Sequence, residues 1–98
     1  MSDKGEIFEK LIHVARKNNM KVKFFPQFSY YGRIQGDRIG LASDVSIVQM
    51  NYTLAHELAH LYLHREINVM DAPETDKAAY EEQADRAARL LLDALSGL

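Results

Sequence analysis

Residues 53–64 read Thr-Leu-Ala-His-Glu-Leu-Ala-His-Leu-Tyr-Leu-His, and this stretch decides the fold of the 98-residue chain. The pattern predicts a helix over residues 51–64 that is apolar on most sides, which is typical of a central, buried helix. Within it, His56 and His60 lie four residues apart, so their imidazoles share one helix face. Imidazoles in an apolar setting need partners for their nitrogens, and one metal ion can serve both rings. The alternative, a chance occurrence of these residues, requires a separate partner for each ring.

Glu57 completes an H-E-x-x-H pattern with the two histidines, and this pattern is typical of zinc sites. It lies roughly 100° around the helix from His56. Its carboxylate can therefore approach a water on the ion without taking a coordination position, and accept a proton from it. The sequence predicts His56 and His60 as ligands of one Zn²⁺ ion and Glu57 as the general base.

The last predicted helix, residues 76–95, offers the third protein ligand that a catalytic zinc site needs. Its apolar stripe, followed backwards by three residues from Ala84, reaches Glu81. A carboxylate on a buried face is costly unless a cation lies opposite, so Glu81 is predicted as the third zinc ligand. The alternative is that Glu81 only begins a solvated acidic patch with Glu82. Asp85, one turn after Glu81, is predicted to accept a hydrogen bond from the outward nitrogen of a ligand histidine.

Other polar residues are considered for supporting roles. His64 continues the four-residue spacing but lies roughly 12 Å along the helix from His56, too far to share the ion, so we expect a cap or a supporting polar group. A purely structural zinc site would need a fourth protein ligand, and His64 fails on reach. A donor to the developing oxyanion is also expected. The candidates are Tyr30, Tyr31, Tyr52, Tyr80 and Arg86. Tyr31, Tyr80 and His64 are kept as candidates for contact with the oxyanion or the substrate.

The rest of the chain predicts an α+β fold in one domain, residues 1–98. An apolar stripe predicts a helix over residues 6–19, and alternation or turn signals predict three short strands and a loop. The strands are expected at residues 21–25, 29–35 and 38–42, and the loop at 65–75. Gly36-Asp37 is a turn signal, so the last two strands are expected to form a hairpin in a small antiparallel sheet. We place an edge that could take a substrate strand near residues 38–43.

Composition narrows the class of protein. Charged residues make up 27% of the chain, apolar residues 47%, and the net charge is −2, which gives no electrostatic footprint for nucleic acid or an anionic membrane. There are no cysteines, so neither disulfides nor a thiolate zinc site can form. The first residues lack the apolar core of a signal sequence, and no apolar run is long enough to span a bilayer. We expect a cytoplasmic protein.

Residues 53–64 resemble the active-site helix of the ImmA/IrrE family of metallopeptidases. The run from Glu81 to Asp85, with the small and leucine pairs that follow at 87–88 and 91–92, is similar to the glutamate-bearing helix of that family. Residues 31–34 and 38–41 resemble its hairpin. The resemblance implies a minimal zincin fold of the gluzincin type: an N-terminal helix, a small sheet, an active-site helix and a C-terminal helix with the ligand glutamate. Ala87 and Asp93 depart from the family pattern, which has a bulky aromatic and a proline there.

The resemblance also implies a function. Members of this family are encoded by phages, mobile elements and their bacterial hosts, and some cleave or inactivate a partner repressor with a helix-turn-helix domain. We therefore expect a zinc metalloendopeptidase that cuts a protein partner, such as a transcriptional repressor encoded beside it. The alternative is a regulatory module with the same fold that grips a repressor or toxin without cutting it. A pure binding module has no need of a base at Glu57, which favours the peptidase.

Overall fold

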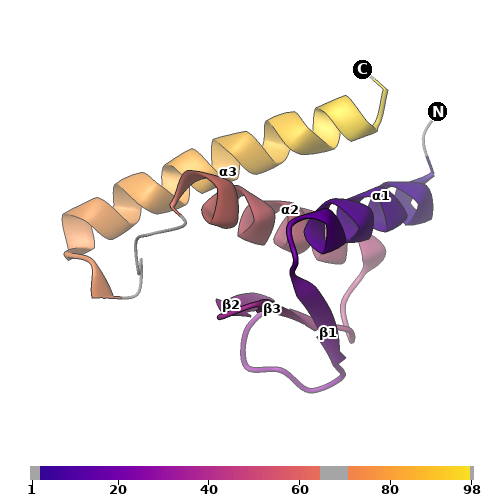
Figure 1. The fold of residues 1–98 in the computed structure, drawn as a ribbon, viewed down its shortest axis with the longest axis horizontal. Coiled ribbons are helices and arrows are strands. Elements are labelled where there is room, and N and C mark those ends of the chain that lie inside the picture. The colour runs from indigo at the N-terminus through magenta and orange to yellow at the C-terminus, as the bar shows by residue number, and fades with distance from the viewer. Residues whose placement is uncertain (1–2, 65–70, 98) are drawn as a thin grey trace.

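The computed structural model describes residues 3–64 and 71–97, and it has the α+β class that the sequence predicts. Its elements are helix α1 (Lys4–Lys17), strands β1 (Lys21–Phe25), β2 (Gly32–Gln35) and β3 (Arg38–Ala42), and helices α2 (Ile47–Leu63) and α3 (Glu74–Leu95). The helices gather on one side of the small sheet, with α2 between α3 and the strands (Figure 1). The predicted loop at 65–75 falls mostly outside the described residues.

The sheet is mixed, so the expectation of an antiparallel sheet is wrong for one of its two pairings. The strand order is β1-β3-β2, with β2 antiparallel and β1 parallel to β3. The hairpin forms as predicted, and Gly36 adopts a φ of 61° in its turn. After β1, residues 26–31 carry the chain past the position that β3 later fills, so β2 enters at the far edge. The strand returning from the hairpin then runs parallel to β1.

This order also corrects the expected substrate edge. Residues 38–43 belong to β3 and its end, and β3 pairs with a strand on each side. Its backbone groups are therefore already used in the ladder. Among the described strands, β1 and β2 form the edges of the sheet.

Helix α2 begins at Ile47, four residues earlier than predicted. The Ser46 hydroxyl accepts a hydrogen bond of 3.1 Å from the Gln49 backbone N–H, which is a normal N-cap. The earlier start adds one turn to the helix. Gln49 and Tyr52 consequently lie on the same rigid element as the H-E-x-x-H residues.

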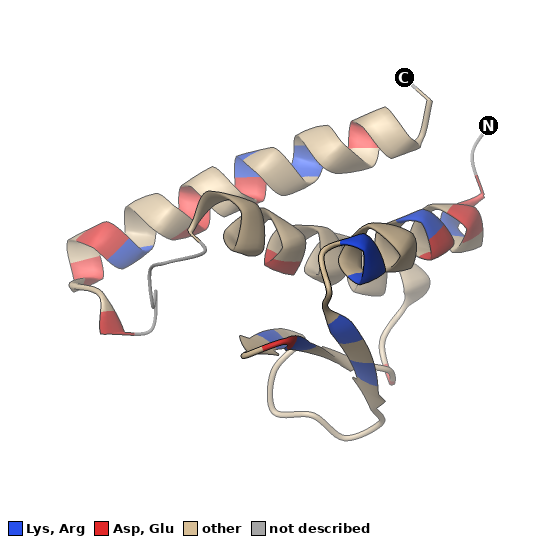
Figure 2. Cartoon of the chain, viewed as in Figure 1, with Lys and Arg blue, Asp and Glu red and all other residues tan. Residues whose placement is uncertain are grey.

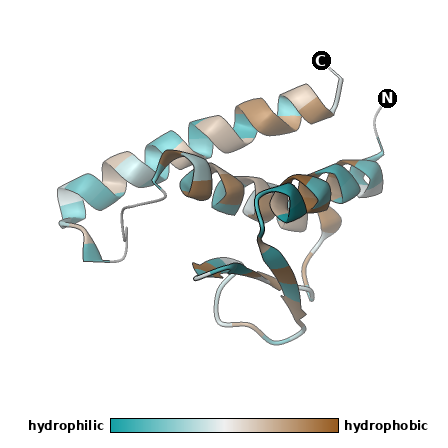
Figure 3. Cartoon of the chain, in the orientation of Figure 1, coloured by the Kyte–Doolittle hydropathy of each residue, from teal (hydrophilic) through white to brown (hydrophobic). Residues whose placement is uncertain are grey.

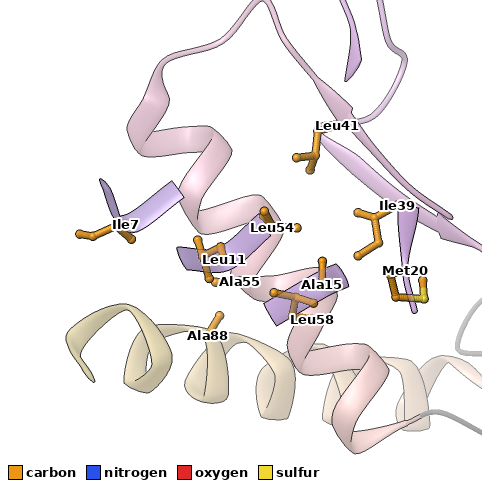
Figure 4. Close-up of a cluster of buried hydrophobic side chains, with 10 residues drawn as sticks. All are labelled: Ile7, Leu11, Ala15, Met20, Ile39, Leu41, Leu54, Ala55, Leu58 and Ala88. Atoms are coloured by element: carbon orange, nitrogen blue, oxygen red, sulfur yellow. The ribbon is translucent and has the colours of Figure 1, made fainter. Parts of the chain in front are cut away.

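The core forms where α2 meets the other elements. Its largest fully buried side chains are Leu11, Ile39, Leu41 and Leu54, from α1, β3 and α2. Figure 4 shows these residues converging with Ala55 and Leu58 of α2 and with Ala88 of α3. Fully burying one such leucine side chain is worth about 1.5–3 kcal/mol. The burial fixes the rotation of α2 and leaves the face with His56 and His60 turned towards α3.

The two halves of α3 differ in character. Its first half is mostly hydrophilic and its second half more hydrophobic (Figure 3). Buried Ala84 and Ala88 lack bulk, so α3 can pack closely on α2.

Acidic and basic residues are mixed along α1 and α3 (Figure 2). Among the described residues, none of the helices is both long and apolar enough to cross a membrane.

Candidate metal centre

Helices α2 and α3 bring the three predicted zinc ligands together. Glu81 Oε2 lies 2.9 Å from His56 Nε2, and Glu81 Oε1 lies 3.0 Å from His60 Nε2. The two Nε2 atoms are 3.1 Å apart. Ligand atoms about 2.0–2.1 Å from one tetrahedral zinc ion lie roughly 3.3 Å from one another. The three side chains thus converge on one point, at separations that suit a single small cation.

The three side chains differ in burial. The histidine side chains are only 16% and 13% exposed, whereas the Glu81 side chain is 54% exposed. Glu81 therefore does not lie on a buried face as the stripe argument expected. It stands one turn before Ala84, the first buried residue of α3, and contacts His56 and His60. The cluster is consequently open to solvent on the Glu81 side.

His60 is supported from behind by a second histidine. Its Nδ1 lies 3.2 Å from Nδ1 of His64, and Nε2 of His64 lies 2.9 Å from Oε1 of Gln83. His64 is the C-cap of α2, and its ring lies 4.7 Å from the Tyr80 ring, centroid to centroid. At 6% exposure it is closed to a substrate, so it supports His60 and is no candidate for the oxyanion.

His56 has a different environment. Its Nδ1 is buried and has no hydrogen-bond partner among the described residues. Asp85 does not accept from a ligand histidine, as was predicted, but from the Tyr52 hydroxyl, and it also pairs with Arg89. Tyr52 stands one turn before His56, and its longer side chain spans the gap to α3. Burial first, and then the Asp85 carboxylate, raise the pKa of Tyr52 to about 12.

Glu57 follows His56 on α2 and is half-buried. Burial is the main reason that the pKa of its carboxyl group rises to about 7; nearby His56 opposes the shift, and nearby Glu81 adds to it to a smaller degree. A carboxyl group with a pKa near neutral pH can both accept and return a proton. Burial also lowers the pKa of His60, which favours the neutral ring that metal coordination requires.

Comparison with known families gives a direct match. The family described as the IrrE N-terminal-like domain, a peptidase family, matches residues 9–94. The chain belongs to this family. The match includes both helices of the centre and the sheet. Neither the curated proteins nor the solved structures contain a significant match.

This IrrE N-terminal-like domain has a cavity of about 400 Å³ beside the centre. The wall consists of the chain before β2, the start of β2 and one face of α2. The lining residues are Ser29, Tyr30, Tyr31, Gly32, Gln49, Tyr52, Thr53, His56 and Glu57. The general base predicted from the sequence therefore opens onto a cavity that could take part of a substrate.

The cavity separates the five predicted oxyanion donors of the domain. Tyr30, Tyr31 and Tyr52 line it, and Tyr31 is 62% exposed. Tyr80 packs on His64 instead. Arg86 pairs with Glu82 on the surface of α3. The Tyr52 hydroxyl is already bonded to Asp85, which leaves Tyr30 and Tyr31 as the cavity tyrosines closest to the predicted role.

Two supporting residues were missed by sequence reasoning. Gln83 lies two positions after Glu81, on another side of α3, and only the crossing of α3 over the end of α2 brings it to His64. Gly32 starts β2, and a Cβ added there would lie 2.3 Å from Cγ2 of Thr53. Only glycine allows β2 to approach α2 so closely. The sequence shows the glycine, but it does not show that the glycine lies against α2.

Proposed function

We propose that the chain is a zinc-dependent metallopeptidase of the gluzincin type, which hydrolyses a peptide bond within a protein partner. The observation that carries the proposal is the convergence of His56, His60 and Glu81 on one point, with Glu57 beside them at the open cavity. Membership of a peptidase family supports the same chemistry.

The donor set suits zinc. Two imidazole nitrogens and one carboxylate oxygen are the ligands of many catalytic zinc sites, and three protein ligands leave one position open. When bound, the ion would supply an activated water and polarise the scissile carbonyl group. Glu57 would accept the proton of that water at its carboxylate and return it to the leaving amine. A pKa near 7 suits both steps at neutral pH.

The edge of the sheet supports a peptide substrate. The Tyr31 carbonyl accepts a hydrogen bond of 2.9 Å from the Ala42 N–H, and in an antiparallel pair inward and outward groups alternate. The backbone groups of Gly32 and Ile34 therefore point away from β3, at an edge that adjoins the cavity. An extended peptide could pair with them and place a peptide bond near Glu57. Tyr31 is our candidate donor to the oxyanion.

For the partner, we propose a helix-turn-helix repressor of a phage or mobile element, encoded beside this chain and met in the cytoplasm. The support is the resemblance of the active-site helix and the glutamate helix to the ImmA/IrrE family. A surface without excess positive charge agrees with a protein rather than a nucleic acid as the direct partner.

The test combines metal analysis with cleavage of the adjacent-encoded repressor. We expect one zinc per chain and discrete repressor fragments with the wild type. Glu57→Gln is the matched control, because it keeps the ligands and removes only the base; it should bind zinc and give no fragments. Absence of stoichiometric zinc, or full cleavage by Glu57→Gln, would contradict the proposal. A stable complex without fragments would instead identify a binding module.

A further inference from the structure

We propose that His64 and Gln83 are positioning residues: together they hold His60 in the tautomer that leaves Nε2 free to bind the metal. The inference deepens the proposed function and rests on its metal site. It starts from a chain of two contacts behind the site, His60 Nδ1 to His64 Nδ1 at 3.2 Å and His64 Nε2 to Gln83 Oε1 at 2.9 Å.

A neutral imidazole carries one hydrogen on its two ring nitrogens. The two hydrogen bonds between His60, His64 and Gln83 can therefore be oriented in only two ways. With the Gln83 oxygen facing the ring, His64 Nε2–H donates and His64 Nδ1 must accept. The hydrogen between the two rings then belongs to His60 Nδ1. His60 Nε2 is left with a lone pair, and this is the atom that lies 3.0 Å from Glu81 and 3.1 Å from His56.

The opposite direction would disable the ligand. If the Gln83 amide nitrogen faced the ring and donated, His64 Nδ1 would donate to His60, and the His60 hydrogen would move to Nε2. The Glu81 carboxylate favours this second arrangement, because it can accept from that Nε2–H at 3.0 Å. The metal-binding tautomer therefore needs support from the other side of the ring, and the His64–Gln83 pair is placed to give it.

Burial makes this support effective. His64 is 6% exposed, and the C-cap position and the Tyr80 ring restrict its movement. Its nitrogens must therefore be satisfied within the protein rather than by solvent. When a residue that hydrogen-bonds to a metal ligand is removed, metal affinity typically falls by about 10–100-fold. His56 Nδ1 has no such partner among the described residues, so this support applies to His60 and not to His56.

The main test compares two changes at Gln83, which is exposed and can be replaced without disturbing the core. Gln83→Leu removes the acceptor. We expect zinc affinity, measured by competition with a chelator, to fall by about 10–100-fold. In the metal-free protein, ¹⁵N shifts of the His60 ring should move from the Nδ1–H towards the Nε2–H form. Those shifts report on the tautomer directly, and a merely structural role would leave them unchanged.

The second variant is the double exchange E82Q/Q83E, which keeps the net charge and puts a group at position 83 that only accepts. We expect wild-type or tighter zinc binding and the Nδ1–H form of His60. His13→Gln, at an exposed position of α1, serves as the control for losing a histidine and should change neither readout. His64→Phe should match Gln83→Leu where it folds.

The outcomes separate this inference from the proposed function. Wild-type affinity and an unchanged tautomer in Gln83→Leu would overturn it, as would an Nε2–H form of His60 in the metal-free wild type. Weaker zinc binding by the double exchange would also contradict it. A wild type that binds zinc and shows these tautomer shifts, yet cuts no repressor, would leave the inference standing and refute the peptidase.

Discussion

The two histidines of the candidate centre have the same relation to the helix but unlike surroundings. Behind His60, hydrogen bonds lead from its Nδ1 to the buried His64 ring and on to the amide oxygen of Gln83, which is exposed on α3. Behind His56, Nδ1 is buried without a partner among the described residues, and the neighbouring Tyr52–Asp85 contact bypasses the ring. The comparison suggests a division of labour. On the His60 side, hydrogen bonds hold the metal-binding ring in place, and on the His56 side, Glu57 and the cavity are available to the substrate.

The largest effect should come from the ligand that both sides share. Zinc binds four-ligand structural sites with about 10–16 kcal/mol, so one ligand carries roughly 2.5–4 kcal/mol, or about 10²–10³-fold in affinity. We expect Glu81→Gln to weaken zinc binding by about that factor, measured by chelator competition. Glu82→Gln is the matched control, since Glu82 is exposed and pairs with surface Arg86. Equal losses in the two variants would contradict the assignment of Glu81.

The second prediction concerns Glu57 at the cavity, and it is tested by the pH dependence of stability. Burial raises the pKa of Glu57 from 4.5 to about 7, so the folded state holds its proton where the unfolded state has lost it. The stability from the protonated form is complete below about pH 4.5 and is lost as pH rises through about 7. The shift corresponds to about 3 kcal/mol. In urea unfolding of metal-free protein, Glu57→Gln should therefore gain on the wild type by about that amount between pH 4.5 and 8. Parallel pH profiles would contradict a buried Glu57.

A third test concerns the wall of the cavity on the His56 side. Gly32→Ala places a methyl group 2.3 Å from Thr53 Cγ2, so β2 must move away from α2. We expect a loss of about 1–3 kcal/mol in unfolding free energy, the usual range for overpacking, and weaker peptide cleavage with unchanged zinc affinity. Thr53→Ser removes the Cγ2 atom, so adding it to Gly32→Ala should restore most of the loss. Failure of this rescue would place the strain elsewhere.

The sequence predicted the parts of this site that depend on one helix at a time. The spacing of His56 and His60 sets their common face, and the stripe of α3 leads to Glu81. The supporting contacts depend on how the two helices cross, which no single-helix pattern contains. Asp85 and Gln83 are two residues apart, yet Tyr52 takes one and His64 the other. The parallel pairing of β1 was missed for a similar reason, because it depends on where residues 26–31 carry the chain.

The smallest effect should come from Tyr52→Phe, and it decides how the His56 side is held. The variant removes the hydroxyl that Asp85 accepts from and keeps the ring that lies 5.8 Å from the His56 ring, centroid to centroid. A hydrogen bond to a charged group is worth about 1.5–3 kcal/mol, and the low end applies here because Asp85 keeps its Arg89 partner. We therefore expect a loss of about 1.5 kcal/mol in urea unfolding and no change in zinc affinity. If zinc affinity fell about tenfold, as it should for Gln83→Leu, the Tyr52–Asp85 pair would position His56 as His64 positions His60, and the proposed division of labour would be wrong.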